Sequence, residues 1–491
     1  MKNTGILYLR MLVTLLVSLY TSRVTLQMLG IDDFGVYGVI GGVVGLFAFL
    51  SRTLTASFNR YICIGIAHED SDEINHVVGA SVIIQFIIIA IVLILGETLG
   101  IWFINNYLVI APEKLYAAHI VFQFSVVTFI VNIFTSAYSS IIISYERMTI
   151  YAYICIFEVI AKLAVVFALS LSENSRLELY AGYICGIQLL VLFIYHLYVR
   201  KYYSAIRPDY SRCAKYVRNM LGFAGYGFLG SFAFVIKNQG LNFLLNIFGG
   251  PALNTARSIS FLVYTAVYNF VGNFQTAFSP YILKRQEIDN KLACSADVKI
   301  FTAVSFSIMS ILIIPILFFV NEILNLWLGA NVPPYTRQFC ILILLIGLCE
   351  AVSSPLQNII YGSGNIKWLQ FGSFIIQMAV LILSYALLKS NYEPTIVYIV
   401  DLSANLMLVI YRVIIAVTNT SLNLKSYFVD TFLPMTIVSI VISYIYYAGY
   451  SYGVTIRLIE VFVCEVIVII YIVRIIPIII IQALVKKVLH R

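Results

Sequence analysis

Residues 77–104 read VVGASVIIQFIIIAIVLILGETLGIWFI, an apolar run whose only charged side chain is Glu97. At about 1.5 Å of rise per residue, a helix of this length can cross the roughly 30 Å of hydrocarbon in a bilayer. Similar runs follow one another along the whole chain. About fourteen spans are predicted, at residues 7–28, 34–54, 77–104, 118–143, 150–171, 179–199, 220–248, 258–283, 298–320, 339–361, 368–388, 395–417, 427–448 and 456–484. Hydrocarbon leaves the backbone no partner outside a helix or a closed barrel, and barrel strands would be shorter and alternating. The sequence therefore predicts an all-α polytopic membrane protein.

The composition and the distribution of charge agree with this prediction. Of the 491 residues, 61% are hydrophobic and 11% are charged, whereas about 25% of a soluble domain is charged. The net charge of +8 does not indicate nucleic acid, because the basic residues are sorted between the two sides of the membrane. The only basic residues in the predicted outer loops are Lys114, Arg176, Arg337, Lys389 and Arg457. By the positive-inside rule, both termini are expected in the cytoplasm.

The predicted spans fall into two lobes and a tail. The basic linker 200–219 separates an N-terminal lobe of six helices, residues 1–205, from a C-terminal lobe of six helices, residues 206–422. Two accessory helices follow in residues 423–491. The second lobe weakly repeats the first at an offset of about 220 residues, with Gly30 matching Gly249. Parallel repeats of this kind are typical of transporters, and they predict a substrate path between the lobes.

Five basic residues inside or near the ends of spans are the strongest functional signal: Arg10, Arg23, Arg52, Lys237 and Arg257. A charge near the centre of a membrane helix costs about 2.5–3.5 kcal/mol on the insertion scale, so such residues are commonly functional. One interpretation is a cationic cavity that binds an anionic substrate. The alternative is snorkelling to the interface, which suits the three arginines near span ends, Arg10, Arg52 and Arg257, better than it suits Lys237.

Three residues are candidates for binding a coupling ion, either Na⁺ or H⁺: Asp401, Asn405 one turn later, and Glu350. Alternatively, either acid balances Lys237 or another buried cation. Glu158 and Lys162 stand four residues apart in the favourable order, so we expect a structural ion pair there.

Several chemistries are not expected. The sequence GYGFLG at residues 225–230 matches the dinucleotide fingerprint, but it lies in a predicted membrane helix with no preceding strand. No phosphate-binding G-x-x-x-x-G-K-[ST] motif is present, so this chain is not expected to hydrolyse ATP. None of the eight cysteines forms a Cys-x-x-Cys pair, so no metal site is predicted. Loops no longer than roughly 20 residues seldom build a catalytic domain. We therefore expect neither an enzyme nor a cofactor.

The opening of the chain resembles that of a known family. LYLRML at residues 7–12, SLYTSRV at 18–24, LGIDDFGVY at 29–37 and the glycine pair 41–42 are similar to bacterial polysaccharide flippases. These are the O-antigen and capsule repeat-unit translocases of the multidrug/oligosaccharidyl-lipid/polysaccharide exporter superfamily. The similarity covers about the first 60 residues, and the helix count and lobe layout extend it along the chain.

The resemblance implies an alternating-access transporter of the bacterial inner membrane. Its expected substrate is an undecaprenyl-diphosphate-linked oligosaccharide, moved from the cytoplasmic to the periplasmic leaflet, and its expected partners are a glycan polymerase and other assembly proteins. Family members are similar to the lipid II flippase, whose cavity arginines have counterparts at Arg23, Arg52 and Arg257. The last two helices would form a groove for the polyprenyl tail.

Two alternatives remain open. A multidrug exporter of the same superfamily would favour an acidic cavity, and the Arg and Lys bias argues against it. A membrane-embedded glycan polymerase or ligase would be expected to have a large outer loop, which this sequence lacks.

Overall fold

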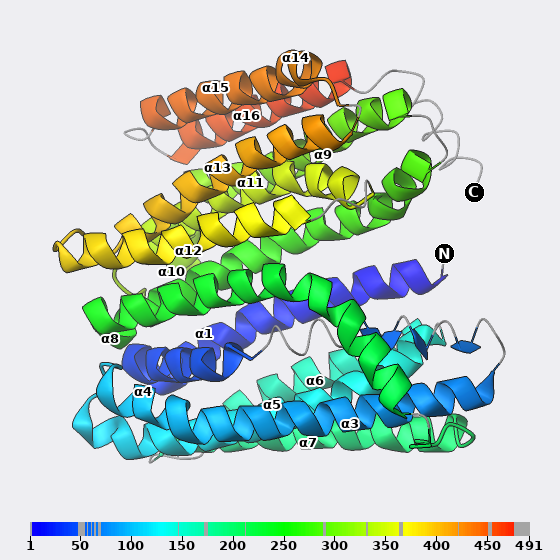
Figure 1. Ribbon diagram of the computed structural model, residues 1–491. Coiled ribbons are helices and arrows are strands. Elements are labelled where there is room, and N and C mark those ends of the chain that lie inside the picture. The colour runs from blue at the N-terminus through cyan, green and yellow to red at the C-terminus, as the bar shows by residue number, and fades with distance from the viewer. Residues whose placement is uncertain are drawn as a thin grey trace. The chain divides into compact units, whose positions relative to one another are not determined.

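The computed structural model describes residues 2–47, 55, 57–59, 61–62, 65–66, 70–145, 147–170, 175–211, 213–287, 291–329, 332–362, 367–420, 422–449 and 454–475. Every regular element among them is a helix, which confirms the predicted all-α fold (Figure 1). Ten helices in this described part are long and apolar enough to span a membrane. Large apolar side chains are exposed on their surfaces, for example Leu16, Ile94, Ile382 and Ile440. Exposed apolar surface of this extent is expected of a protein that faces lipid.

The helices divide into two compact units. Unit 1 comprises Met1–Ser258 and Ala330–Pro334, and unit 2 comprises Ile259–Gly329 and Tyr335–Arg491. The lobe boundaries proposed from the sequence, after residues 205 and 422, stay predictions.

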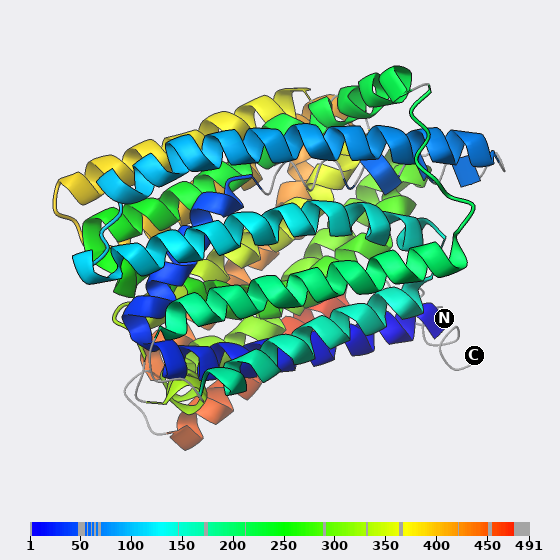
Figure 2. The same cartoon turned by 90° about the horizontal axis from the view of Figure 1, so that it is seen from below.

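Unit 1 is a layer of long helices. Its elements are α1 (Lys2–Gly45), α3 (Ser71–Leu95), η1 (Gly96–Gly100), α4 (Ile101–Asn106), η2 (Pro112–Lys114), α5 (Leu115–Ser144), α6 (Met148–Leu169), α7 (Arg176–Tyr202) and the first part of α8 (Cys213–Glu287). The contacts join α3 to α5, α5 to α7, α7 to α6 and α6 to α1. Figure 2 shows these five helices side by side in that order.

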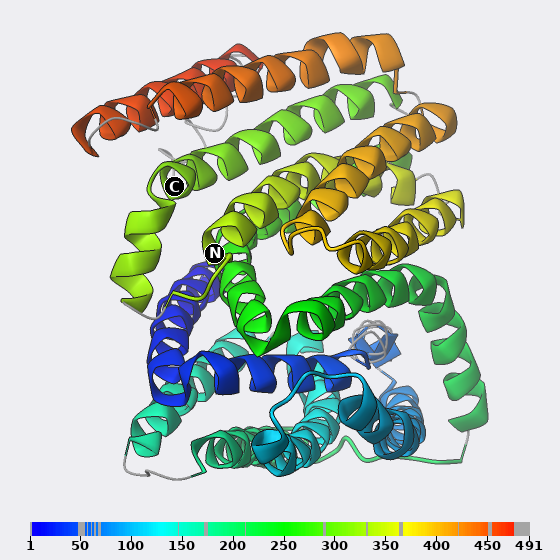
Figure 3. The same cartoon turned by 90° about the vertical axis from the view of Figure 1, so that its left-hand side faces the viewer.

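Unit 2 begins with the rest of α8. Its other elements are α9 (Lys291–Phe318), α10 (Val320–Leu328), α11 (Thr336–Gly362), α12 (Lys367–Lys389), α13 (Ile396–Asn419), α14 (Leu424–Tyr427), η3 (Phe428–Phe432), α15 (Leu433–Gly449) and α16 (Val454–Ile475). Helix α11 packs between α9 and α13, and α12 packs on α13. Helices α15 and α16 lie side by side along α9, as Figure 3 shows.

Two glycines with left-handed backbone divide the longest helices. Gly30 bends α1 with a φ of 80°, and Gly250 bends α8 with a φ of 73°. Residues with a Cβ lose roughly 1–2 kcal/mol in this conformation, so glycine is favoured at both places. Helix α8 contains the predicted spans 220–248 and 258–283, and α1 contains the span 7–28 and the first part of the span 34–54. The two kinks are separated by the predicted repeat offset of about 220 residues, although the second falls at Gly250 and not at Gly249.

Local chemistry also explains where helices begin. Helix α3 starts at Ser71, ahead of the predicted span, because the Asp70 side chain accepts hydrogen bonds from the backbone N–H groups of Asp72 and Glu73 at 2.9 and 3.0 Å. Such N-caps satisfy amides that the first helical turn leaves without partners. In the interior, Ile84 and Ile142 are almost fully buried in unit 1, and Val468 and Ile314 in unit 2.

Candidate functional site

The kink of α8 brings together residues that precede and follow Gly250. The Arg257 guanidinium donates from Nη2 to the backbone oxygen of Asn238 at 2.9 Å, and its distance to Asn238 Oδ1 is 3.5 Å. Lys237 is the neighbour of Asn238 in the chain. Lys237 is 4% exposed and Arg257 is 7% exposed. Both predicted cations are therefore buried in unit 1, and Arg257 contacts the residue that follows Lys237.

A network of asparagines holds this bend in place. The Asn254 amide donates to the Asn242 side-chain oxygen at 2.7 Å and to its backbone oxygen at 2.8 Å. Asn246 donates to Asn254 Oδ1 at 3.0 Å and accepts from the Val109 backbone N–H at 2.8 Å. We refer to Asn238, Asn242, Asn246, Asn254, Thr255 and Arg257 as the kink seam. Because buried amides must be hydrogen-bonded, this network specifies one geometry for the bend.

The kink seam also contacts α1. Asn242 Nδ2 lies 3.4 Å from the carbonyl oxygen of Gly38, and the Thr255 hydroxyl donates to the carbonyl oxygen of Ile31 at 2.6 Å. A Cβ built on Gly35 would lie 2.1 Å from the Pro251 carbonyl oxygen. Glycine at position 35 therefore permits a close backbone approach between the two bent helices.

The other three predicted cations have different surroundings. The Arg10 guanidinium stands 5.1 Å from the centre of the Tyr151 ring, and its Nη1 is 3.7 Å from Cys155 Sγ. Both of these partners belong to α6, so Arg10 packs in the α1–α6 interface. Arg23 is partly buried on the part of α1 that precedes Gly30. Arg52 lies outside the described residues.

Unit 2 contains a second polar region, formed by three helices. Tyr264 of α8 donates its hydroxyl to the Glu350 carboxylate of α11, and its ring stacks on Tyr268 with centroids 5.3 Å apart. Arg412 of α13 donates from Nη1 to the Ser353 hydroxyl of α11 at 2.6 Å. We refer to these five residues, together with Asp401 and Asn405, as the unit 2 polar cluster.

The spacing of residues on α13 explains the alignment of its polar groups. Asn405 follows Asp401 by four residues and Arg412 follows it by eleven. These spacings put all three residues on one helical face. Asn405 Nδ2 donates to the Asp401 backbone oxygen at 2.8 Å and to its Oδ1 at 3.0 Å. Asp401 and Asn405 are each 6% exposed. The structure thus brings the predicted ion-coupling residues Asp401 and Asn405 into direct contact.

Glu350, the third predicted ion-coupling residue, has Arg412 as a cation within electrostatic range. Tyr264, which hydrogen-bonds Glu350, interacts electrostatically with Asp401 as well. All three candidates therefore belong to one cluster. A Cβ built on Gly347 would lie 2.9 Å from the Tyr264 ring, so the small residue one turn before Glu350 lets Tyr264 approach α11.

Arg412 is absent from the residues selected by sequence. It lies inside the predicted span 395–417, so the insertion cost that singled out Lys237 would have identified it. The asparagines of the kink seam could not be selected from the sequence in this way, because uncharged amides are common in helices. Their hydrogen bonds to one another form only because α8 bends. The predicted pair of Glu158 and Lys162 is confirmed, with Nζ and Oε1 2.5 Å apart.

A groove runs along the outer helices of unit 2. Its cavity of about 720 Å³ is lined by α9, η3, α15 and α16. Apolar side chains such as Ile437, Ile467 and Ile470 line most of it, and Lys299 and Arg474 supply positive charge. Lys299 is bound to Asp430 Oδ2 at 2.9 Å. Because Asp430 also lines the groove and offsets Lys299, the groove is mainly apolar, with Arg474 as a further positive charge.

The sequence matches no protein-family model and no curated protein. The fold, however, is similar to solved transporter structures. The lipid II flippase MurJ in an inward closed conformation has a TM-score of 0.62 and 14% identity, and the alignment covers 100% of this chain and 99% of that one.

Two further similar structures are multidrug transporters. An inward-facing multidrug resistance MATE family transporter of the MOP superfamily has a TM-score of 0.64 and 13% identity, covering 82% of this chain and 94% of that one. A MATE transporter in complex with MaL6 has a TM-score of 0.58 and 12% identity, covering 85% and 95%. The chain therefore has the fold of these membrane transporters.

Proposed function

We propose that this protein is a flippase of the multidrug/oligosaccharidyl-lipid/polysaccharide exporter superfamily. Its substrate is an undecaprenyl-diphosphate-linked oligosaccharide, which it moves from the cytoplasmic to the periplasmic leaflet of the bacterial inner membrane by alternating access. Both termini lie in the cytoplasm, and a glycan polymerase and other assembly proteins act on the exported product. The transporter fold and the resemblance of the first 60 residues or so support this proposal.

The observation that carries the proposal is the pair of buried cations at the α8 kink. Lys237 and Arg257 are both less than one-tenth exposed. Burying a charge in a membrane helix costs free energy, so such residues are usually kept because they have a function. A diphosphate offers several oxygens that accept charge-assisted hydrogen bonds, and the planar fork of arginine binds two of them at once. In this role the Lys237 ammonium attracts the diphosphate as a point charge, and the Arg257 guanidinium fixes the orientation of the diphosphate.

The groove of unit 2 is a candidate site for a polyprenyl tail, considered by itself. A polyprenyl chain is apolar and elongated, as the groove among α9, η3, α15 and α16 requires. Burying each methylene contributes about 0.8 kcal/mol, so a long tail adds substantial affinity without demanding specific contacts.

Energy coupling is assigned to the unit 2 polar cluster. Asp401 and Asn405 offer carboxylate and amide oxygens on one buried helical face, which are suitable ligands for Na⁺, and Asp401 or Glu350 can instead bind a proton. Protonation or ion binding would change the net charge near Arg412 and Tyr264. Such a change would favour one conformation of the protein over another.

A multidrug exporter is the second candidate, favoured by the partly buried Glu350 and the buried Asp401, because carboxylates attract cationic drugs. Analysis of lipid-linked oligosaccharides in a deletion strain separates the candidates. The flippase account predicts that repeat units accumulate on the cytoplasmic face of the membrane. Accumulation on the periplasmic face would indicate a polymerase or ligase, and an unchanged glycan would favour the drug exporter.

A further inference from the structure

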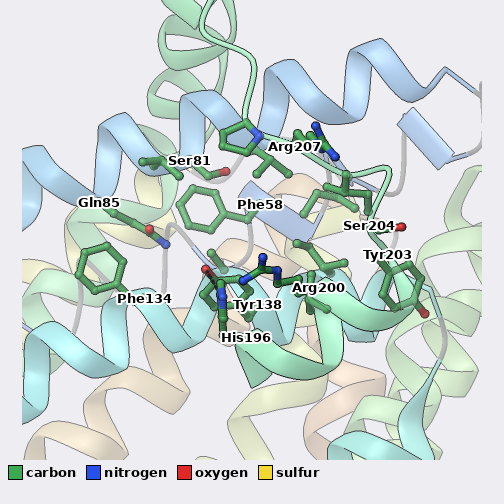
Figure 4. A pocket seen from close by; sticks show the side chains of 18 residues that line it. Phe58, Ser81, Gln85, Phe134, Tyr138, His196, Arg200, Tyr203, Ser204 and Arg207 are labelled. Atoms are coloured by element: carbon green, nitrogen blue, oxygen red, sulfur yellow. Dashed lines mark hydrogen bonds between the residues drawn. The ribbon is translucent and has the colours of Figure 1, made fainter. Parts of the chain in front are cut away.

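A second cavity lies wholly within unit 1, away from the kink seam. Its volume is about 580 Å³, within the range of about 300–1,000 Å³ that is usual for small-molecule sites. Its walls come from α3, α5, α7 and the segment at residues 203–208 that follows α7. In Figure 4, Tyr138, His196 and Arg200 lie on one side, Phe58 lies between them and α3, and Arg207 and Ser204 border the other side.

The cavity has an apolar part and a border with positively charged side chains. Phe58, Ile62, Phe134, Ile141 and Val199 supply apolar surface. Arg200 and Arg207 supply positive charge, and none of the described lining residues is acidic. Neither arginine side chain has a hydrogen-bond or ion-pair partner among the residues that the structure describes. Such a site is complementary to a molecule that joins an apolar chain to an anionic group.

Polar side chains fix the walls of this cavity in place. His196 Nδ1 and the Tyr138 hydroxyl are 3.0 Å apart, which ties α7 to α5. Gln85 Nε2 donates to the Ile133 carbonyl oxygen at 3.1 Å, which ties α3 to α5. The backbone N–H of Arg207 donates to Asn75 Oδ1 at 2.8 Å, so the segment after α7 is anchored to α3. These bonds preorganise the cavity before any ligand enters.

The position of the arginines indicates where the ligand comes from. Arg200 lies in the last turn of the candidate span Arg176–Tyr202, and Arg207 lies just beyond it. Both arginines are therefore expected near the boundary between hydrocarbon and water, at the depth of lipid headgroups. The predicted topology puts this boundary in the cytoplasmic leaflet, which is rich in anionic lipid, and basic pockets between membrane helices on that side bind such headgroups.

We propose that this cavity is a binding site for an anionic glycerophospholipid of the bilayer. The phosphate would be held by Arg200 and Arg207, and an acyl chain would fill the apolar part lined by Phe58 and Phe134. A site of this kind would make the stability or activity of the protein depend on the anionic lipid content of the membrane. The inference does not rest on the proposed transport function.

The test is lipid binding to the purified full-length chain, measured by native mass spectrometry with phosphatidylglycerol or phosphatidylcholine added to the micelles. We expect the parent protein to retain phosphatidylglycerol preferentially. The double change Arg200→Gln and Arg207→Gln should weaken its binding about tenfold or more, given about 1 kcal/mol for each basic residue near anionic lipid. The control pair Lys215→Gln and Arg218→Gln removes the same charge from exposed positions on α8 that do not line the cavity, and it should change binding much less.

A second variant separates the cavity from surface charge. Ala137→Leu adds apolar volume to the cavity wall without altering charge, so it should also displace phosphatidylglycerol while the thermal midpoint in lipid-free detergent stays near that of the parent. Equal losses in the two double variants, or no preference for phosphatidylglycerol in the parent, would overturn the proposal. Displacement of phosphatidylglycerol by polyprenyl diphosphate at equal concentration would assign the cavity to that lipid and likewise overturn it.

Discussion

The Thr255 hydroxyl donates a 2.6 Å hydrogen bond to the carbonyl oxygen of Ile31, next to the kinks of both α8 and α1. Ile31 directly follows Gly30, and Thr255 stands shortly after Gly250. The two bends, which lie 220 residues apart in the sequence, are therefore joined through residues beside them. The geometry of one bend constrains the other, and the buried cations lie beside this junction.

The first prediction concerns the close approach of the two bent helices. Gly35→Ala should destabilise the protein by about 1–3 kcal/mol, because its Cβ would clash with the Pro251 backbone, which has no flexible end to move aside. Thermal unfolding of the purified protein in detergent measures the effect. Gly41→Ala on the same helix is the control, since nothing lies within 4 Å of its added Cβ. Equal midpoints for the two variants would show that the approach is looser than described.

The second prediction concerns the buried cations. Lys237→Glu should abolish glycan export while leaving the protein abundant in the membrane, because a carboxylate repels the diphosphate. Complementation of a deletion strain measures export, with Lys215→Glu at an exposed position as the charge-matched control. Arg23→Lys should be only partly tolerated, since the bidentate fork is lost. Full complementation by Lys237→Glu would remove this residue from the substrate site.

The third prediction concerns the unit 2 polar cluster. Glu350→Gln and Arg412→Gln should each destabilise the protein, because each leaves the opposite charge in a low-dielectric setting. The double variant should be less destabilised than the sum of the single effects by about 0.5–2 kcal/mol. Denaturation by sodium dodecyl sulfate in mixed micelles gives the three differences in free energy. Strict additivity would mean that Arg412 does not stabilise the charge of Glu350.

The fourth prediction concerns energy coupling. Asp401→Asn keeps the size and shape of the side chain and its capacity to accept from Asn405, so substrate binding should persist. Transport in proteoliposomes should no longer respond to an imposed Na⁺ or H⁺ gradient. The exposed Glu393→Gln in the segment between α12 and α13 is the control. A variant that responds to both gradients as the parent does would identify Asp401 as a structural counter-charge.

The sequence was sufficient for the fold class because the signal is repeated in every span. In hydrocarbon the backbone of an apolar run as long as residues 77–104 finds its hydrogen-bond partners within a helix, so the helical assignment did not depend on propensity. The kinks were not predicted, because Gly249 and Gly250 are equivalent in a sequence and only the backbone angles show which of them bends α8.

The candidate sites were only partly accessible from the sequence. Buried charge drew attention to Lys237, Arg257, Asp401 and Glu350, since its cost can be counted residue by residue. Which charges meet is a property of the tertiary structure. The contact of Arg257 with Asn238 exists only because α8 bends between them, and the proximity of Arg412 to Glu350 depends on the packing of α11 against α13.

The central claim is most directly tested by reconstituted transport. Purified protein is placed in proteoliposomes with a labelled undecaprenyl-diphosphate-linked oligosaccharide, and the fraction of label that an impermeant glycan-cleaving enzyme can reach is followed over time. The account predicts that the parent protein makes the protected fraction accessible, and that Lys237→Glu leaves it as protected as it is in protein-free liposomes. A protected fraction that stays constant with the parent protein under imposed Na⁺ and H⁺ gradients would contradict the claim that this protein is a flippase.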